Sequence, residues 1–181
     1  MCMSSFSLSN NEADKEVSAK RGRNAVIFIV VAALLFIADQ LSKTIFNVYT
    51  PGQVIAEPIP GVLGLKLIHN TGGAWGIFGG MTQALAIFSF IMCAVIVLYL
   101  FVIAPSSSAM MAVGLALVFA GGVGNLIDRI ANGYVIDFIQ LLFIDFPVFN
   151  VADIGVTCGI VVVLVALMIE SRSDCRTNGA N

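Results

Sequence analysis

Residues 82–104 of the chain read TQALAIFSFIMCAVIVLYLFVIA and carry no charged side chain. They belong to a longer charge-free stretch that lies between Lys66 and Asp128. A helix needs about 20 apolar residues to cross the hydrocarbon core of a bilayer, and this stretch is long enough to cross it more than once. The sequence therefore predicts a fold that lies in a membrane.

The composition of the whole chain agrees with this prediction. Of the 181 residues, 59% are hydrophobic and 11% are charged, and the mean hydropathy is +0.97. Ordinary soluble domains are about 45–50% apolar and about 25% charged. The balance excludes a soluble globular domain, a disordered chain and a disulfide-stapled secreted scaffold. The net charge of −2 favours no nucleic-acid partner.

Four transmembrane helices are predicted, over residues 25–46, 82–104, 109–127 and 150–169. The first apolar run could instead be a cleaved signal peptide, because basic residues precede it. No small-residue cleavage site follows it, so a membrane span fits better. Residues 1–24 are expected to be a flexible cytoplasmic tail, residues 25–170 the membrane domain, and residues 171–181 a second cytoplasmic tail.

The basic residues that flank the first and last spans place both termini in the cytoplasm by the positive-inside rule. The segments 47–81 and 128–149 then lie on the extracytoplasmic side. Three of the five prolines fall within residues 47–70, where residues 62–68 suit a short strand. The expected fold class is thus a membrane all-α protein with four transmembrane helices and a small extracytoplasmic β-containing segment.

Six ionisable side chains fall at or near the outer ends of the predicted spans. They are Asp39, Lys43, Asp128, Arg129, Asp137 and Asp153. Such groups cost about 2.5–3.5 kcal/mol each at membrane depth and usually mark function. Asp39 and Lys43 are four residues apart and suit a structural ion pair. Asp128 and Arg129 point apart and need partners elsewhere, and Asn125 lies one turn before them.

Asp137 and Asp153 differ from the others because no basic residue lies close to either in the sequence. Asn150 is three residues before Asp153 and faces the same way, and a return through Pro147 could bring the two acids together. Two carboxyl groups in a low-dielectric site share one proton, which suits peptide hydrolysis by an aspartic dyad. On spacing alone, a proton or cation pathway is an equally good interpretation.

Other motifs add little on their own. No P-loop, zinc-peptidase or serine-hydrolase motif occurs, and the four cysteines form no ligand pattern, so no metal or cofactor is expected. The single histidine, His69, suits an interfacial polar role. The glycine-rich residues 70–80 suit either a flexible connection with Trp75 as an interfacial anchor or a loop that receives an extended peptide.

Five motifs together resemble the bacterial lipoprotein signal peptidases, the signal peptidase II family of intramembrane aspartic peptidases. In order they are Asp39-Gln-Leu-Ser-Lys43, Asn70-Thr-Gly-Gly-Ala-Trp75, Gly121-Gly-Val-Gly-Asn-Leu-Ile-Asp-Arg129, Val135-Ile-Asp-Phe-Ile139 and Phe149-Asn-Val-Ala-Asp153. The resemblance implies an enzyme of the bacterial cytoplasmic (inner) membrane. Such an enzyme cuts prolipoproteins on the N-terminal side of a diacylglyceryl-modified cysteine.

The resemblance also implies roles for single residues. Asp137 and Asp153 would be the catalytic acids. Four residues would position substrate or support the dyad, namely Asn70, Asn125, Arg129 and Asn150, and three would hold the site together, namely Asp39, Lys43 and Asp128. The implied partners are prolipoprotein substrates and membrane lipid, with no metal or cofactor.

The sequence also leads to an expectation about the assembly state and leaves two alternative functions open. A monomer is expected, because the small residues Gly155 and Gly159 suit packing within one bundle. A small proton-coupled transporter or channel component could use the same carboxylates. A structural membrane-anchoring subunit would need none of them for chemistry.

Overall fold

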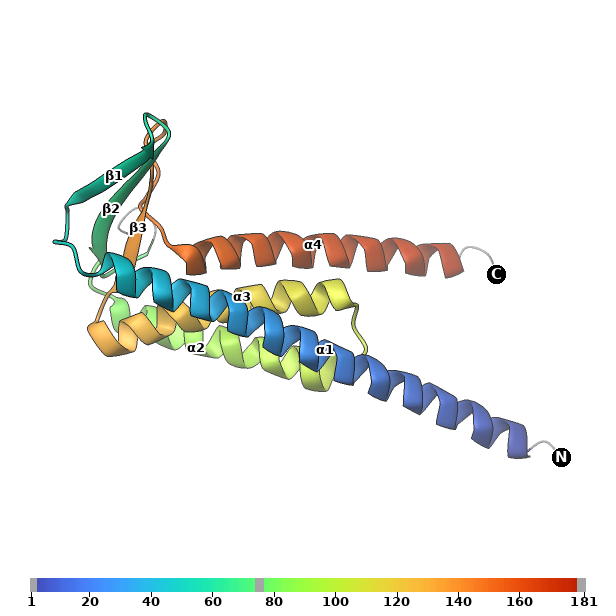
Figure 1. The fold of residues 1–181 in the computed structure, drawn as a ribbon. Coiled ribbons are helices and arrows are strands. Elements are labelled where there is room, and N and C mark those ends of the chain that lie inside the picture. Colours follow the sequence, from blue (N-terminus) through green and yellow to red (C-terminus); the bar gives the residue numbers. More distant parts are fainter. Residues whose placement is uncertain (1–2, 74–76, 179–181) are drawn as a thin grey trace.

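The computed structural model describes residues 3–73 and 77–178. Its elements, in chain order, are α1 (Met3–Phe46), β1 (Val54–Ile59), β2 (Leu63–Asn70), α2 (Thr82–Leu98), the π-helical turn η2 (Tyr99–Ile103), α3 (Ala109–Asn132), β3 (Val135–Leu141) and α4 (Val151–Asn178). The four α-helices run side by side, the sheet stands at one end of them, and both termini lie at the other end (Figure 1). Trp75, the expected interfacial anchor, lies outside the described residues.

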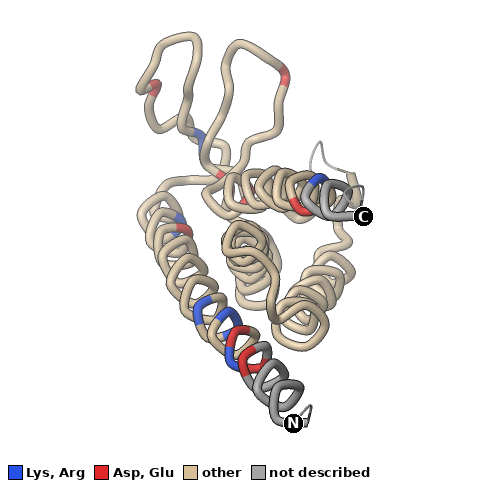
Figure 2. Tube along the Cα trace, turned by 90° about the vertical axis from the view of Figure 1, so that its right-hand side faces the viewer, with Lys and Arg blue, Asp and Glu red and all other residues tan. Residues whose placement is uncertain are grey.

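The prediction of four membrane spans is confirmed. Within the described residues, four helices are long and apolar enough to cross a bilayer, at Asp14–Phe46, Thr82–Ile103, Ala109–Asn132 and Val151–Arg172. Large apolar side chains cover their outer faces; for example, Leu34 is 65% exposed and Phe90 is 64% exposed. Such faces suit contact with lipid rather than water. Charged residues are absent from α2, which is uniformly tan in Figure 2.

The helix α3 is the centre of the bundle, because it packs against each of the other three helices. Glycines allow the close approach: a Cβ atom on Gly121 would collide with the carbonyl oxygen of Ala152 in α4. The expected packing role of the small residues in α4 is also confirmed, since Gly159 lies against the backbone of α3 and Gly155 against Leu35 of α1. These contacts bring the ends of α1, α3 and α4 that lie next to the sheet together.

The sheet is antiparallel with the strand order β1-β2-β3. The strand predicted over residues 62–68 is present as β2, but β3 was not predicted from the sequence. The first four residues of β3 are all buried, so its sequence lacks the apolar–polar alternation of a half-exposed strand. Leu67 of β2 and Phe138 of β3 form a small core with Phe46, whose ring stacks on that of Phe138 at 4.2 Å.

Three helices are longer than expected. The predicted flexible tail over residues 1–24 is helical from Met3 onward, in a segment without proline where Lys20 and Glu16 form an ion pair of 2.8 Å across one turn. The helix α4 likewise continues to Asn178 instead of ending near residue 169.

The third helix, α3, ends at Asn132 rather than at residue 127. Gly133 stops it in the left-handed conformation (φ 79°) and donates its N–H to the carbonyl oxygen of Arg129. Asp128 and Arg129 are therefore helical residues, and the outer segment expected at 128–149 begins after residue 132. Because both residues lie in α3, their side chains point back toward the helix bundle.

Candidate active site

Asp153 is fixed by the N-terminus of α4. Asn150 directly precedes the helix and accepts a hydrogen bond on its Oδ1 from the backbone N–H of Asp153 (3.0 Å). In return, Oδ2 of Asp153 accepts the backbone N–H of Asn150 (3.1 Å). This reciprocal arrangement is a capping box. The same two bonds that start the helix hold the Asp153 carboxylate in one orientation.

Asp137 lies in the middle of β3, opposite Ile68 of β2, and is only 2% exposed. Its Oδ2 accepts a hydrogen bond from Nδ2 of Asn70 at the end of β2 (2.9 Å). Its Oδ1 accepts one from Nδ2 of Asn150 (2.7 Å). Asn150 therefore contacts both acids, and it joins the strand that carries Asp137 to the helix that carries Asp153.

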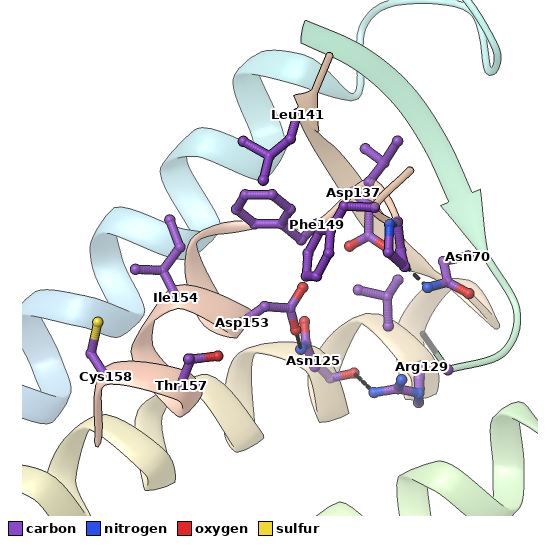
Figure 3. A pocket seen from close by; sticks show the side chains of 15 residues that line it. Asn70, Asn125, Arg129, Asp137, Leu141, Phe149, Asp153, Ile154, Thr157 and Cys158 are labelled. Carbon is purple, nitrogen blue, oxygen red and sulfur yellow. Dashed lines mark hydrogen bonds between the residues drawn. The ribbon is translucent and has the colours of Figure 1, made fainter. Parts of the chain in front are cut away.

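Asn125 of α3 completes the hydrogen bonds to the two acids. Its Nδ2 donates to Oδ1 of Asp153 (2.8 Å), and its Oδ1 accepts from Nδ2 of Asn150 (3.1 Å). Each of the four carboxylate oxygens of Asp137 and Asp153 thus accepts one N–H donor. Figure 3 shows the two acids on facing elements, with Asn70 and Asn125 bonded to them from either side.

A buried ionic cluster lies beneath this network. Lys43 Nζ donates to Oδ2 of Asp39 (2.9 Å), to Oδ2 of Asp128 (2.9 Å) and to Oδ1 of Asn125 (3.0 Å). Lys43 is 1% exposed and the two acids are 0% and 3% exposed. The ion pair predicted between Asp39 and Lys43 is present, and Lys43 is also the partner that Asp128 needed.

The two acids of this cluster also accept backbone hydrogen bonds. Asp39 Oδ1 accepts the N–H of Ala152 in the first turn of α4 (2.9 Å), and Asp128 Oδ2 accepts the N–H of Ile136 in β3 (3.2 Å). The cluster therefore ties α1 and α3 to the two elements that carry Asp137 and Asp153. Burial without these partners would be costly for each charge.

Arg129 faces the same region from α3. Its Nη1 donates to the carbonyl oxygen of Asn125 (3.3 Å) and its Nη2 to that of Gly72 (3.4 Å). Among the described side chains, its Nε and Ser107 Oγ are the buried polar atoms without a hydrogen-bond partner. All nine residues singled out from the sequence thus belong to one connected network, in which the buried Nε of Arg129 has no hydrogen-bond partner.

A cavity of about 480 Å³ opens over the two acids. The residues on its polar side were predicted from the sequence, and the residues on its apolar side were not. The apolar and neutral residues on that side include Leu141, Phe146, Phe149, Ile154, Thr157 and Cys158. Helical spacing could have indicated the last two, because Thr157 and Cys158 follow Asp153 and Ile154 by four residues.

A second hollow of about 330 Å³ shares Asp137 and Asn70 with the first. It is lined by residues 68–73, Gly79, Pro147 and Val148. The described part of the glycine-rich loop therefore borders Asp137, as a peptide-receiving loop would. His69 has structural contacts in this region: it stacks on Tyr134 at 3.8 Å, and its Nε2 lies 2.9 Å from Asn47 Oδ1.

The surroundings of Asp137 favour its protonated form. Burial first, and then the charge of Asp153, raise its pKa from the ordinary value of 3.8 to about 7, against the opposing effects of the hydrogen bonds from Asn70 and Asn150 and of the positive charge of Lys43. The group can therefore hold or release a proton near neutral pH. Within the described residues, no three His, Cys, Asp or Glu side chains are grouped so as to hold a metal ion.

The family model of signal peptidase (SPase) II matches residues 31–169 of the chain. The lipoprotein signal peptidase of Latilactobacillus sakei is 36% identical over 147 residues, which are 81% of this chain and 97% of that protein. The lipoprotein signal peptidase of Lactobacillus johnsonii is 40% identical over 151 residues, covering 82% and 96% of the two chains.

Solved structures are similar as well. A bacterial membrane enzyme determined at 2.3 Å resolution superposes with a TM-score of 0.74 at 34% identity, and covers 80% of this chain and 88% of its own. A second bacterial membrane enzyme, determined at 1.9 Å, gives a TM-score of 0.70 at 35% identity, covering 77% and 91%. The residues that the family model matches, 31–169, include the sheet and parts or all of each of the four helices.

Proposed function

The chain belongs to the signal peptidase II family, and we propose that Asp137 and Asp153 are the catalytic dyad of this lipoprotein signal peptidase. The protein is an aspartic peptidase that spans the membrane and removes signal peptides from prolipoproteins. One observation carries the assignment of the dyad. The two carboxyl groups line the same cavity and are both hydrogen-bonded to the buried side chain or backbone of Asn150.

The proposed reaction is hydrolysis by a dyad that holds one proton. The ionised carboxylate takes a proton from a water molecule, whose oxygen bonds to the carbonyl carbon of the scissile peptide. The protonated carboxyl group gives its proton to the carbonyl oxygen. The tetrahedral intermediate then collapses: the C–N bond breaks, the leaving nitrogen receives a proton from the dyad, and one hydroxyl group of the intermediate returns its proton to the dyad, which again holds one proton.

The two hollows suggest how the substrate lies across the acids. The larger cavity is apolar on its α4 side and suits the signal peptide and the diacylglyceryl group. The second hollow, lined in part by residues 68–73, suits the polypeptide that follows the cut. We propose that Arg129 and Asn70, which line the larger cavity, bind substrate carbonyl groups. The cut would then fall N-terminal to the lipid-modified cysteine.

We also propose the orientation and the assembly state. Lys20, Arg21 and Arg23 on α1 and Arg172 on α4 lie at the end of the bundle that carries both termini. The positive-inside rule places that end in the cytoplasm and the sheet and dyad at the extracytoplasmic face. All the groups of the site come from one chain, which supports a monomeric enzyme.

A cleavage assay tests the proposed function. Purified protein in detergent, without any ion gradient, is incubated with a diacylglyceryl-modified prolipoprotein peptide, and the products are identified by mass spectrometry. We expect a cut directly before the modified cysteine and no cut in the unmodified peptide. The absence of hydrolysis in detergent would favour a transport role for the same carboxylates.

The pKa of Asp137 predicts how cleavage depends on pH. An ordinary aspartate loses its proton near 3.8, whereas Asp137 keeps its proton up to about pH 7. A dyad that must hold one proton loses activity when that proton leaves, so kcat/KM should fall about tenfold for each pH unit above about 7. The profile is measured from about pH 5 to about pH 9. A flat profile above pH 7 would contradict the acid role of a buried carboxyl group.

A further inference from the structure

Lys43 lies beneath the dyad but donates to neither catalytic carboxylate. An ammonium group has three donors, and here they go to Asp39, Asp128 and Oδ1 of Asn125, at 2.9, 2.9 and 3.0 Å. The first two contacts neutralise buried acids. The third fixes the orientation of the Asn125 amide, because an amide oxygen only accepts hydrogen bonds and an amide nitrogen only donates them.

The fixed amide directs a strong donor at one member of the dyad. With its oxygen held by Lys43, Asn125 presents Nδ2 to Oδ1 of Asp153 at 2.8 Å. Hydrogen bonds in series polarise one another, and a cation at the far end of the amide strengthens its N–H donor. The positive charge of Lys43 is thereby transmitted to Asp153 through one side chain.

The other oxygen of Asp153 lies at the N-terminus of a helix. It accepts the backbone N–H of Asn150 at 3.1 Å, at the N-terminus of α4, where the helix dipole stabilises negative charge. The donors to Asp137 are the neutral amides of Asn70 and Asn150. Asn150 Nδ2 has two hydrogens but three acceptors, because it also donates to the carbonyl oxygen of Ile136 (3.3 Å) and to Oδ1 of Asn125 (3.1 Å). Each acid has two uncharged donors, but one donor to Asp153 belongs to an amide whose oxygen binds the Lys43 cation, and the other lies at a helix N-terminus.

We propose that Lys43 is a positioning residue that acts through Asn125 and, with the N-terminus of α4, assigns the negative charge to Asp153. Asp153 then takes the proton from water, and Asp137 gives its proton to the carbonyl oxygen of the scissile bond. This assignment rests on the proposed function of the dyad and divides the roles within it. The pKa of Asp137, raised to about 7, agrees with the acid role.

Within the described residues, the other charged and titratable groups around the dyad form their hydrogen bonds with groups other than the two acids. On the packed elements they are Asp39 on α1, Asp128 and Arg129 on α3, and His69 on β2. The two acids are ion-paired with Lys43, Arg129 donates to the backbone carbonyls of Asn125 and Gly72, and His69 bonds to Asn47. The amide oxygens of Asn70 and Asn150 accept backbone N–H groups, whereas the amide oxygen of Asn125, the donor to Asp153, binds the Lys43 cation.

A crossed pair of variants tests the assignment. The pH profile of kcat/KM is measured for the wild type, for Asn125→Ala, which removes the side-chain donor to Asp153, and for Asn70→Ala, which removes a donor to Asp137. We expect Asn125→Ala to move the acidic limb upward by roughly one pH unit and to leave the alkaline limb in place. Asn70→Ala should instead raise the pKa of Asp137 and so move the alkaline limb to higher pH by a similar amount. A merely structural role would lower the whole profile without moving one limb.

Three outcomes would overturn the assignment. Asn125→Ala could move the alkaline limb and Asn70→Ala the acidic limb, both variants could move the same limb, or neither variant could move a limb. If Asn125→Ala does not fold, Asn125→Asp gives the same readout. The aspartate keeps the size of the side chain and an oxygen for Lys43, but it places an acceptor oxygen instead of an N–H donor next to Asp153. The acidic limb should then move upward at least as far. Normal cleavage by an Asp137→Asn or Asp153→Asn variant would refute the dyad itself, so the two proposals fail separately.

Discussion

Asp137→Asn and Asp153→Asn are each expected to lower kcat for prolipoprotein cleavage by about 10²- to 10⁴-fold, the usual contribution of a positioned general acid or base. An amide can neither take the proton from water nor supply one to the carbonyl oxygen. The two acids carry out different proton transfers in the proposed reaction, so neither can replace the other. The measurement is the rate of release of the signal peptide from a lipidated prolipoprotein peptide at saturating substrate.

Asp145→Asn is the matched control for these two variants. Asp145 lies in the same outer region of the chain, between β3 and α4, but it is exposed and does not line either hollow. The chemical change is identical, and cleavage should stay near the wild-type rate. Thermal unfolding in detergent shows whether each variant is folded. A folded Asp137→Asn or Asp153→Asn protein that cleaves at the wild-type rate would refute the dyad.

Lys43→Met is expected to lower the free energy of unfolding by about 3–5 kcal/mol, because it leaves two buried carboxylates without their cation. Asp39 and Asp128 are 0% and 3% exposed, and water cannot replace the lost ammonium group. Both acids also bind backbone N–H groups of Ala152 and Ile136, so the loss should spread to the first turn of α4 and to β3. Unfolding by denaturant in detergent micelles measures the change.

Lys20→Met is the corresponding control outside the bundle core. Lys20 forms an ion pair of 2.8 Å with Glu16, but both side chains are exposed to solvent, at 42% and 68%. Exposed ion pairs contribute little to stability because water screens them. The Lys20 variant should therefore unfold like the wild type. Equal stability of the Lys43 and Lys20 variants would show that the buried cluster does not hold the site together.

Local sequence patterns predicted several elements of the site correctly. The spacing of Asp39 and Lys43 gave their ion pair, because residues four apart share a helix face. The spacing of Asn150 and Asp153 placed them together at the start of the fourth helix, where the structure shows the capping box. These features depend on neighbours within one turn, so the sequence contains all the information needed to predict them.

Other parts of the site depend on residues that are distant in the sequence. The strand β3 has no alternation to reveal it, since its first residues are buried on both faces. The partners of Lys43 on α3 lie more than eighty residues away, and no spacing rule connects them. The apolar side of the cavity combines β3, the segment before α4 and α4 itself. Its shape follows only from how these elements pack.

The sequence by itself determined that this chain crosses a membrane four times and that few of its side chains can do chemistry. It did so because hydropathy is a property of each segment alone, and because an ionisable group at membrane depth is costly enough to be rare. Only the tertiary structure decided which donors face each acid, and therefore how the two acids differ. That difference arises from contacts among α1, α3, β3 and α4, which exist only when the helices pack at the close distance that the glycines of α3 and α4 allow.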